Sequence, residues 1–434
     1  MQNHPADQEP RCVLGSFFAP KSQNTPTWEQ RKLDEAFDFT VPNNTLSRAE
    51  LNQESGSVRN VHYGDVLIKY GSVLDAQNDE LPFITGRSKD DFKGALLQNG
   101  DIIIADTAED ETTGKVCEIV NIQDKDVVAG LHTMVCRPKN KTAEGYFGYY
   151  MNSSSYHHQL LPLMQGIKVL SLSKTNVQKT TVKYPKDKAE QQKIADCLRR
   201  IDTLITLHQR KYEKLVNIKK SMLDKMFPQN GASVPEIRFK GFTDPWEQRK
   251  LEEYLEVSGQ KNFEGIYTKE DVLSVSGDFG IVNQIEFQGR SFAGASVANY
   301  GVVETGDIVY TKSPLKSNPY GIIKANKGKN GIVSTLYAVY KPKQSANPEF
   351  VQNYFEQDAR MNNYMHPLVN KGAKNDMKVS AENALKGQIV FPDIKEQRTI
   401  SEFFRNLDTL ITLHQRKLEK LQNIKKSCLE KMFV

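Results

Sequence analysis

Apolar residues recur at alternating spacings of four and three along two long stretches of the chain, 187–227 and 393–433. A seven-residue pattern of this kind predicts a long helix that packs along another helix. The seam positions of the first stretch are Ile194, Leu198, Ile201, Ile205, His208, Tyr212, Leu215, Lys219, Met222 and Met226. Those of the second are Ile400, Phe404, Leu407, Ile411, His414, Leu418, Leu421, Lys425, Cys428 and Met432. A histidine and a lysine interrupt both seams at matching positions, so the two helices share one design.

The two helical stretches are copies of each other. Residues 202–211 return unchanged as residues 408–417, at an offset of 206. The pairs Glu190-Gln191 and Glu396-Gln397, the segments 217–221 and 423–427, and the segments 225–227 and 431–433 repeat as well. Solenoids and propellers repeat every 20 to 50 residues or so, whereas a period near half the chain predicts two similar halves.

An aspartate marks the start of each predicted helix. Asp187 and Asp393 both follow a proline closely and are followed three residues later by a glutamate, Glu190 or Glu396, which is the pattern of a capping box. A lone helix of this length would leave its apolar seam in water. Either the two copies pack against each other within one chain, or each recruits another protein. We favour antiparallel packing within the chain, because the intervening stretch is long enough to fold and return the second helix.

Each helix follows a module of mixed α and β pattern. The modules open on the same six residues, at 28–33 and 246–251, which we interpret as a short helix. A Gly-Asp turn then leads into apolar strands at 100–104 and 306–310, again 206 apart. Further strands are expected at 66–68, 134–136, 322–323 and 336–340, and helices at 145–161 and 348–365. After the Gly-Asp strands the copies diverge, at 105–113 and 311–318, as expected for one scaffold that reads two different partners.

The sequence therefore predicts a mixed α+β fold in which two unlike modules alternate with two long helices of an antiparallel coiled coil. Residues 1–27 match nothing in the second half and form an atypical N-terminal extension. The expected divisions after it are a first module at 28–186, a first helix at 187–230, a second module at 231–392 and a second helix at 393–434.

Composition and charge narrow the class of protein. The chain is 38% hydrophobic and 26% charged, and it has neither an apolar run that could span a membrane nor a signal-peptide pattern. Its five cysteines are dispersed, which argues against a disulfide framework or zinc site and fits a reducing cytoplasm. The net charge of +5 is uneven, because the two helices are basic and the rest of the chain is slightly acidic. Modules that bind DNA must therefore do so through local basic patches.

Two dissimilar α/β modules alternating with two near-identical helices resemble the specificity subunits of type I restriction-modification systems. The most specific marks are the repeated D-T-L-I-T-L-H-Q-R-K and K-M-F segments, the W-E-Q-R-K-L module openings, and P-E-I-R-F-K-G-F at 235–242. The segment before Trp28 departs from the pattern, since it has no P-E-I-R-F counterpart. The resemblance covers nearly the whole chain.

The resemblance implies that each module is a target-recognition domain for one half of a split DNA site. It also implies that the helices set the spacer and carry two methyltransferase subunits, with restriction and translocase subunits as further partners. The chain would then be non-catalytic, with S-adenosylmethionine, ATP and magnesium bound by partner subunits. Two rival functions are a scaffold that binds proteins and a self-contained DNA-modifying enzyme. The enzyme is disfavoured, because no P-loop, H-E-x-x-H motif or nuclease carboxylate cluster is recognisable.

Base reading needs hydrogen-bonding side chains on loops, with hydroxyl and basic groups on the phosphates. In the first module the candidates are Arg59, Asn60, His62, Tyr63, Lys69, Arg87, Lys89, Thr112, Thr113 and Lys115. In the second module they are Arg290, Tyr300, Lys312, Ser313, Lys316, Asn318, Lys371, Lys374, Asn375 and Lys378. The basic glycine loop at 371–376 is the strongest of these, and it resembles a recurring loop of the family's recognition domains. An exposed solubilising side chain is the ordinary alternative for each residue. No catalytic or metal-binding residue is predicted.

Overall fold

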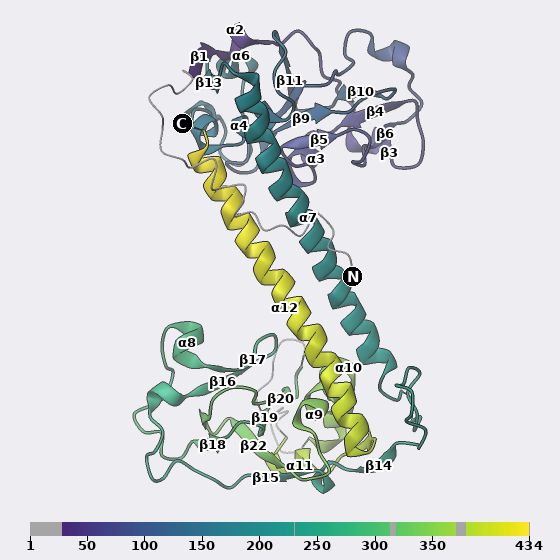
Figure 1. Cartoon of the computed structure of the whole chain (residues 1–434), viewed down its shortest axis with the longest axis vertical. Coiled ribbons are helices and arrows are strands. Elements are labelled where there is room, and N and C mark those ends of the chain that lie inside the picture. The colour runs from purple at the N-terminus through teal and green to yellow at the C-terminus, as the bar shows by residue number, and fades with distance from the viewer. Residues whose placement is uncertain (1–27, 230, 313–317, 370–378, 434) are drawn as a thin grey trace. The chain divides into compact units, whose positions relative to one another are not determined.

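The computed structural model describes residues 28–229, 231–312, 318–369 and 379–433, which fall into two compact units (Figure 1). Unit 1 comprises residues 1–209 and 416–434, and unit 2 comprises residues 210–415. Each unit therefore combines one α+β module, the first part of the helix that follows it, and the last part of the other helix. The mixed α+β fold predicted from the sequence is confirmed.

The module of unit 1 is built on a five-stranded and a four-stranded sheet, with strand orders β2-β11-β7-β9-β5 and β10-β4-β6-β3. The strands are β1 Trp28–Lys32, β2 Phe37–Asp38, β3 Leu51–Asn52, β4 Val58–Val61, β5 Val73–Asp75, β6 Phe83–Ile84, β7 Ile102–Ala105, β8 Thr107–Ala108, β9 Val116–Val120, β10 Asp126–Ala129, β11 Thr133–Pro138, β12 Leu170–Ser171 and β13 Thr181–Pro185. The helices before α7 are α2 Leu33–Ala36, η2 Arg48–Glu50, α3 Tyr63–Ile68, η3 Lys89–Phe92, α4 Tyr146–Met151, α5 Ser154–His157, η4 Leu161–Leu163 and α6 Lys174–Gln178. The predicted strands at 100–104 and 134–136 correspond to β7 and β11.

The module of unit 2 has a four-stranded sheet of order β15-β22-β19-β20 and three two-stranded sheets. The strands are β14 Glu247–Lys250, β15 Leu255–Val257, β16 Leu273–Ser276, β17 Gly280–Asn283, β18 Gly301–Val303, β19 Ile308–Thr311, β20 Ile323–Ala325, β21 Gly331–Val333, β22 Tyr337–Pro342 and β23 Gln388–Phe391. The helices before α12 are η5 Leu251–Glu253, η6 Lys269–Asp271, α8 Gln284–Gln288, α9 Pro348–Tyr354, α10 Asp358–Met365, η7 His366–Leu368 and α11 Ala381–Ala384. Strands β19, β20 and β22 match the predicted strands at 306–310, 322–323 and 336–340.

The predicted opening helices are wrong, because both W-E-Q-R-K segments form strands. β1 pairs antiparallel with β13, and β14 pairs antiparallel with β23. A helix of so few residues gains little from its own hydrogen bonds, whereas a strand is stabilised by a complete ladder with its neighbour. Each opening strand is thereby fixed to the strand that leads into the long helix.

Three other predicted elements differ from the structure. Residues 66–68 end helix α3 rather than forming a strand, because the His62 side chain caps the helix by accepting from the Gly64 amide at 3.1 Å. The single helix expected at 145–161 is divided into α4 and α5, with a turn at Asn152 and Ser153. The helix expected at 348–365 is likewise divided, into α9 and α10.

The two long helices are α7 Lys188–Lys225 and α12 Ile394–Lys431, each uninterrupted over 38 residues. The predicted aspartate caps are confirmed: Asp187 accepts from the Ala189 amide at 2.9 Å, and Asp393 accepts from the Glu396 amide at 3.0 Å. The described helices include none that is both long and apolar enough to cross a membrane.

The helix seam is the face by which α7 and α12 join the core of each unit. In unit 1 the first half of α7 and the end of α12 share one apolar cluster, which includes Leu198, Ile201 and Cys428. In unit 2 the second half of α7 and the first half of α12 share another, which includes Leu223, Phe404 and Leu407. In both units the beginning of one helix meets the end of the other, so the predicted antiparallel packing is confirmed (Figure 1). The remaining predicted seam positions are buried or half-buried: Ile205, His208, Tyr212, Leu215, Ile411, His414, Leu418 and Leu421.

The repeated K-M-F segments insert a phenylalanine into the core of each module. Phe433, at the end of α12, is buried in unit 1, where its ring lies 5.7 Å from Tyr146 and 5.5 Å from Tyr150. Phe227, at the end of α7, is buried in unit 2, 5.5 Å from the Phe350 ring and 6.0 Å from the Phe404 ring. Each helix is therefore anchored in a unit other than the one in which it begins.

Candidate nucleic-acid interface

The repeated Gly-Asp turns hold the central strands of both modules. The glycines adopt positive φ, +90° at Gly100 and +94° at Gly306, a conformation that glycine adopts without steric cost. The aspartate that follows is buried and accepts a backbone amide three residues upstream at 2.7 Å in both copies. Arg137 pairs with Asp101 at 2.7 Å, and Lys341 pairs with Asp307 at 2.9 Å. The framework repeat is thus a set of buried polar contacts.

The repeated Glu-Gln pair fixes the root of each long helix. Gln191 donates to the Pro185 carbonyl at 2.8 Å and accepts from the Ala143 amide at 3.0 Å. Gln397 makes the same two kinds of bond, to the Pro392 carbonyl at 2.9 Å and from the Asn347 amide at 2.9 Å. The side-chain amide, which both donates and accepts, ties the helix to the loop ahead of the module's aromatic helix.

The seam lysines lock the two helices in register. Lys425 on α12 pairs with Asp202 on α7 at 2.6 Å in unit 1, and Lys219 on α7 pairs with Asp408 on α12 at 2.8 Å in unit 2. The two contacts join matching residues of the repeat. Lys219 also pairs with Glu356 at 2.6 Å. Burial opposes the charge on Lys219, but its two carboxylate partners outweigh that cost and raise its pKa.

Several predicted DNA-binding residues of the first module make contacts within unit 1. The Arg59 guanidinium lies 4.9 Å from the centre of the Phe83 ring, and Lys89 pairs with Asp126 at 2.9 Å. Lys69 pairs with Glu80 at 3.3 Å. Lys115 donates to the Leu67 carbonyl at 2.7 Å, and burial lowers its pKa. These cations are held in place by their neighbours, which leaves fewer of them available to a phosphate.

Burial separates the remaining first-module candidates. Asn60 and Thr113 are fully buried, so their side chains are out of reach of a base edge in this conformation. Arg87 and Thr112 are exposed. The Tyr63 ring packs beside two histidine rings, with centroid distances of 4.7 Å to His62 and 5.3 Å to His132.

The second module gives a smaller described set. Arg290 is exposed, and its guanidinium lies 4.6 Å from the centre of the Phe292 ring. Burial and the neighbouring Lys261 lower the pKa of the half-buried Lys312. Asn318 is buried and donates to Asp358 at 2.7 Å, whereas Tyr300 is half-buried. Ser313, Lys316, Lys371, Lys374, Asn375 and Lys378 lie outside the described residues.

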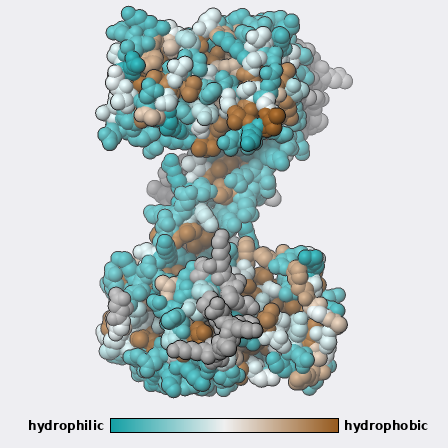
Figure 2. Space-filling model, turned by 180° about the vertical axis from the view of Figure 1, so that it is seen from behind, coloured by the Kyte–Doolittle hydropathy of each residue, from teal (hydrophilic) through white to brown (hydrophobic). Residues whose placement is uncertain are grey.

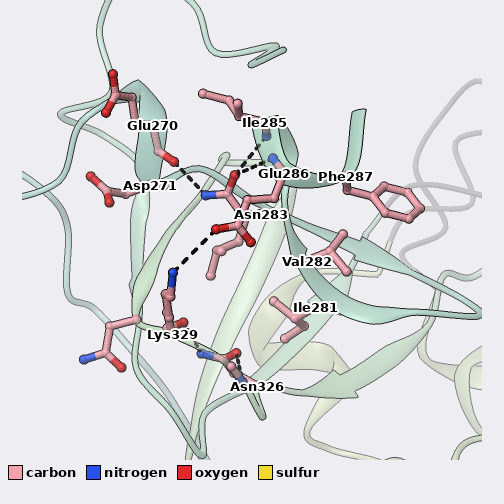
Figure 3. Close-up of a pocket in the computed structure, with 13 residues that line it drawn as sticks. Glu270, Asp271, Ile281, Val282, Asn283, Ile285, Glu286, Phe287, Asn326 and Lys329 are labelled. Atoms are coloured by element: carbon pink, nitrogen blue, oxygen red, sulfur yellow. Dashed lines mark hydrogen bonds and ion pairs between the residues drawn. The ribbon is translucent and has the colours of Figure 1, made fainter. Parts of the chain in front are cut away.

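The second module also has a surface hollow beside β16, β17 and α8 (Figure 3). Asn283 holds its wall together by donating to the Glu270 carbonyl at 2.6 Å and accepting from the Ile285 amide at 2.9 Å. Lys329 pairs with Glu286 at 3.5 Å. Carboxylates dominate its charged side chains, which does not suit a DNA backbone. No cluster of metal-ligating side chains occurs within the described ranges.

Two sequence comparisons with known proteins agree with the resemblance carried by the repeats. The family model described as the type I restriction modification DNA specificity domain matches residues 26–217. The candidate specificity subunit of the type I restriction enzyme MjaX of Methanocaldococcus jannaschii is 22% identical over 424 residues, which cover 92% of this chain and 91% of that protein. Residues 26–217 therefore match the type I restriction-modification DNA specificity domain family, and the chain is similar along nearly its whole length to a specificity subunit.

A solved member of this family has the same fold. The crystal structure of the S subunit of a type I restriction-modification system from M. genitalium aligns with a TM-score of 0.56, at 14% identity, over 96% of this chain and 98% of that one. The family implies target-recognition modules and DNA binding. Specificity subunits of this family are non-catalytic.

At the ends of the two central strands, sequence reasoning identified Lys312 and missed Asp106, His132 and Leu336. In the first module Asp106 and His132 follow and precede the paired residues of β7 and β11, and the Asp106 amide donates to the His132 carbonyl at 3.1 Å. In the second module Lys312 and Leu336 hold the equivalent places, with the same bond at 3.1 Å. The sequence signal that could have identified these residues is the position, just after each Gly-Asp strand, at which the two copies stop matching.

Proposed function

We propose that this specificity subunit reads a bipartite DNA target. Each recognition module reads one half of the site, the paired helices set the number of base pairs between the halves, and the helices dock the methyltransferase subunits. Restriction subunits complete the complex. S-adenosylmethionine, ATP and magnesium are bound by those partner subunits.

The observation that carries the proposal is the contrast between framework and strand ends. The interhelical lysine–aspartate pairs, the Glu-Gln pairs at the start of the long helices and the buried aspartates of the Gly-Asp turns repeat almost residue for residue. The side chains at the ends of the central strands differ. Two readers of different half-sequences, held by one repeated scaffold, need this combination. Most of the face seen in Figure 2 is hydrophilic in both units, as suits modules that approach a charged polymer.

The decisive experiment lengthens both helices. Four residues inserted after Gln209 and four after Gln415 leave the Lys425–Asp202 and Lys219–Asp408 pairs intact within their units. About 6 Å of added helix, at about 1.5 Å per residue, compares with about 3.4 Å per base pair. We expect the spacer of the methylated target to grow by one or two base pairs while both half-sequences stay the same.

The readout is single-molecule sequencing of methylated adenines in cells that express the complete complex. A four-residue insertion between the exposed residues Asn140 and Lys141 is the matched control, and it should leave the spacer unchanged. Altered half-sequences with an unchanged spacer would refute the helices as the measuring element. A protein-binding scaffold would instead give no sequence-specific retention of DNA in a mobility-shift assay with the methyltransferase subunits present.

A further inference from the structure

The end of the β7–β11 pair is a place where one backbone arrangement carries different side chains in the two modules. The Asp106 to His132 bond of unit 1 and the Lys312 to Leu336 bond of unit 2 are equal in length and position. An acid and an imidazole in one module stand where the other has an amine and an aliphatic side chain. The difference affects chemistry and leaves the scaffold unchanged, as expected of a recognition position.

His132 is held in an unusual conformation. Its φ of +54° lies in the left-handed region, which costs a non-glycine residue free energy and persists only where the surroundings enforce it. Its Nδ1 lies 3.4 Å from the Thr107 hydroxyl and 3.5 Å from an Asp106 carboxylate oxygen, and Thr107 donates to Asp106 at 2.8 Å. The side chain is 47% exposed, and no hydrogen bond within the described residues uses Nε2. One ring nitrogen is thus fixed and the other is available to a ligand.

A closed loop is attached to Asp106 and Thr107, the two residues that contact the His132 ring. The Leu172 amide donates to the Asp106 carbonyl at 2.8 Å, and Ser171 pairs with Thr107 across β12 and β8. Gln165 and Ser171 exchange two backbone hydrogen bonds, of 2.9 and 2.8 Å, which close the loop at 166–170.

The tip of this loop is shaped by Gly166, whose φ is +125°, and a Cβ there would lie only 1.9 Å from the Val169 carbonyl oxygen. The closed loop presents a fully exposed Ile167 next to an exposed Lys168.

We propose that His132, Thr107, Ile167 and Lys168 form the base-reading edge of the first module, and this inference rests on the proposed function. The ligand is the major-groove edge of duplex DNA. His132 Nε2 offers one hydrogen bond to a base, Thr107 and Asp106 orient its ring, and Ile167 can contact a thymine methyl group. Lys168 binds a phosphate. The apolar part of the edge is too small for a protein-docking patch, and its mixture of one apolar side chain, one basic side chain and one imidazole matches what a groove displays.

The test replaces His132 by its counterpart in the second module. His132→Leu is expressed in the complete complex, and the methylated target is determined by sequencing. We expect one or two positions of a single half-site to lose discrimination by about tenfold, with the other half-site and the spacer unchanged. His158→Leu is the control. His158 is exposed and directly follows α5, and its substitution should leave the target unchanged.

Two further variants keep the test decisive if His132→Leu fails to fold. Thr107→Val removes the hydroxyl at nearly constant size, and the same base position must lose discrimination. Lys168→Ala should weaken binding to all DNA sequences alike and reduce the slope of log K against log salt by about one.

An unchanged target in both the Thr107→Val and His132→Leu complexes would overturn the reading edge. Loss of methyltransferase assembly with DNA recognition intact would also overturn it, by marking the edge as protein-binding. Absence of any bipartite target in the wild-type complex would instead refute the proposed function itself.

Discussion

The repeated glutamate at the start of each long helix has a different partner in each module. Glu190, at the start of α7, accepts from the indole of Trp28 at 3.2 Å. Its counterpart Glu396, at the start of α12, is 1% exposed and forms a two-pronged pair with Arg238, with both bonds at 2.7 Å. Arg238 belongs to the P-E-I-R-F segment, whereas the first module lacks that segment before Trp28. The repeated glutamate therefore accepts a hydrogen bond from a neutral indole in the first module and forms an ion pair with an arginine in the second. The partner depends on the segment that precedes the module.

A second contrast concerns the contact between the central sheet and the aromatic helix. In unit 1 the Glu118 carboxylate on β9 accepts from the amides of Gly145 and Gly148 at the start of α4, at 2.6 and 3.0 Å. In unit 2 the Gln352 side chain on α9 accepts from the Ala325 amide of β20 at 3.1 Å. The same packing thus uses a titratable group in one module and a neutral one in the other. The two modules should respond differently to pH.

The largest expected effect comes from removing the helix anchors. Phe433→Ala and Phe227→Ala should each lower the free energy of unfolding by about 3–5 kcal/mol, because both rings are fully buried. Hydrogen exchange should show the loss in unit 1 for Phe433→Ala and in unit 2 for Phe227→Ala. Leu410→Ala, whose side chain is 43% exposed, is the control and should change stability by under about 0.5 kcal/mol. Exchange that rises equally in both units would contradict separate anchoring.

Arg238→Met should be nearly as damaging, by about 3 kcal/mol, because it leaves the buried Glu396 carboxylate without its cation. Chemical denaturation of the complete chain measures the change. Arg249→Met is the control, since Arg249 is exposed and its ion-pair partners among the described residues, Glu247 and Glu253, are exposed as well. Similar losses for the two variants would show that the P-E-I-R-F segment does not secure α12.

Glu118 should make the stability of unit 1 depend on pH. Burial raises the pKa of Glu118 to about 7, well above the value of about 4.5 expected in the unfolded chain. The folded state therefore binds the proton more tightly, and stability falls as pH rises from about 4.5 to about 7. The full change is on the order of 3 kcal/mol.

The measurement is the free energy of unfolding of wild type and of Glu118→Gln at pH 5, 6, 7 and 8. The variant should show a flatter profile over this range, because glutamine does not titrate. Gln352→Ala is the companion change in unit 2, and it should lower stability by the same amount at every pH. Parallel profiles for wild type and Glu118→Gln would exclude Glu118 as the titrating group.

The smallest expected loss of stability comes from breaking the two interhelical ion pairs, Lys219–Asp408 and Lys425–Asp202. Lys219 has two carboxylate partners and Lys425 has one, so Lys219→Met should cost about 2 kcal/mol and Lys425→Met about 1 kcal/mol. Thermal melts of the two variants test the order. A double-mutant cycle with Asp408→Asn isolates the interhelical part of the Lys219 cost. A larger loss for Lys425→Met would mean that Glu356 adds nothing to the lock in unit 2.

The repeat made the helices, their antiparallel packing and the mixed fold predictable from the sequence. Periodicity in a long amphipathic segment is a strong local signal, and an unpaired seam permits few alternatives. The opening strands were not predictable, because their pairing with β13 and β23 is set by residues more than a hundred positions away. The same holds for the broken aromatic helices.

The candidate site was harder to predict than the fold. Residue type identified His62, Tyr63 and Lys115 as chemistry that DNA could use, but it could not show that Lys115 is held by the Leu67 carbonyl. His132 carries no motif. Its importance comes from a strand end that only the paired sheets define, together with a loop that joins it from a distant part of the chain.

The placement of Phe433 has a consequence for how the protein folds during its synthesis on the ribosome. The aromatic core around Tyr146 and Tyr150 is otherwise complete once α7 has begun, yet the ring that fills it is synthesised only after all of unit 2. The nascent first module therefore lacks Phe433 and the rest of the α12 end, including Cys428, until the rest of the chain has been translated. We therefore expect the first module either to bind a chaperone during synthesis or to complete its core slowly after release, when the end of α12 packs into it.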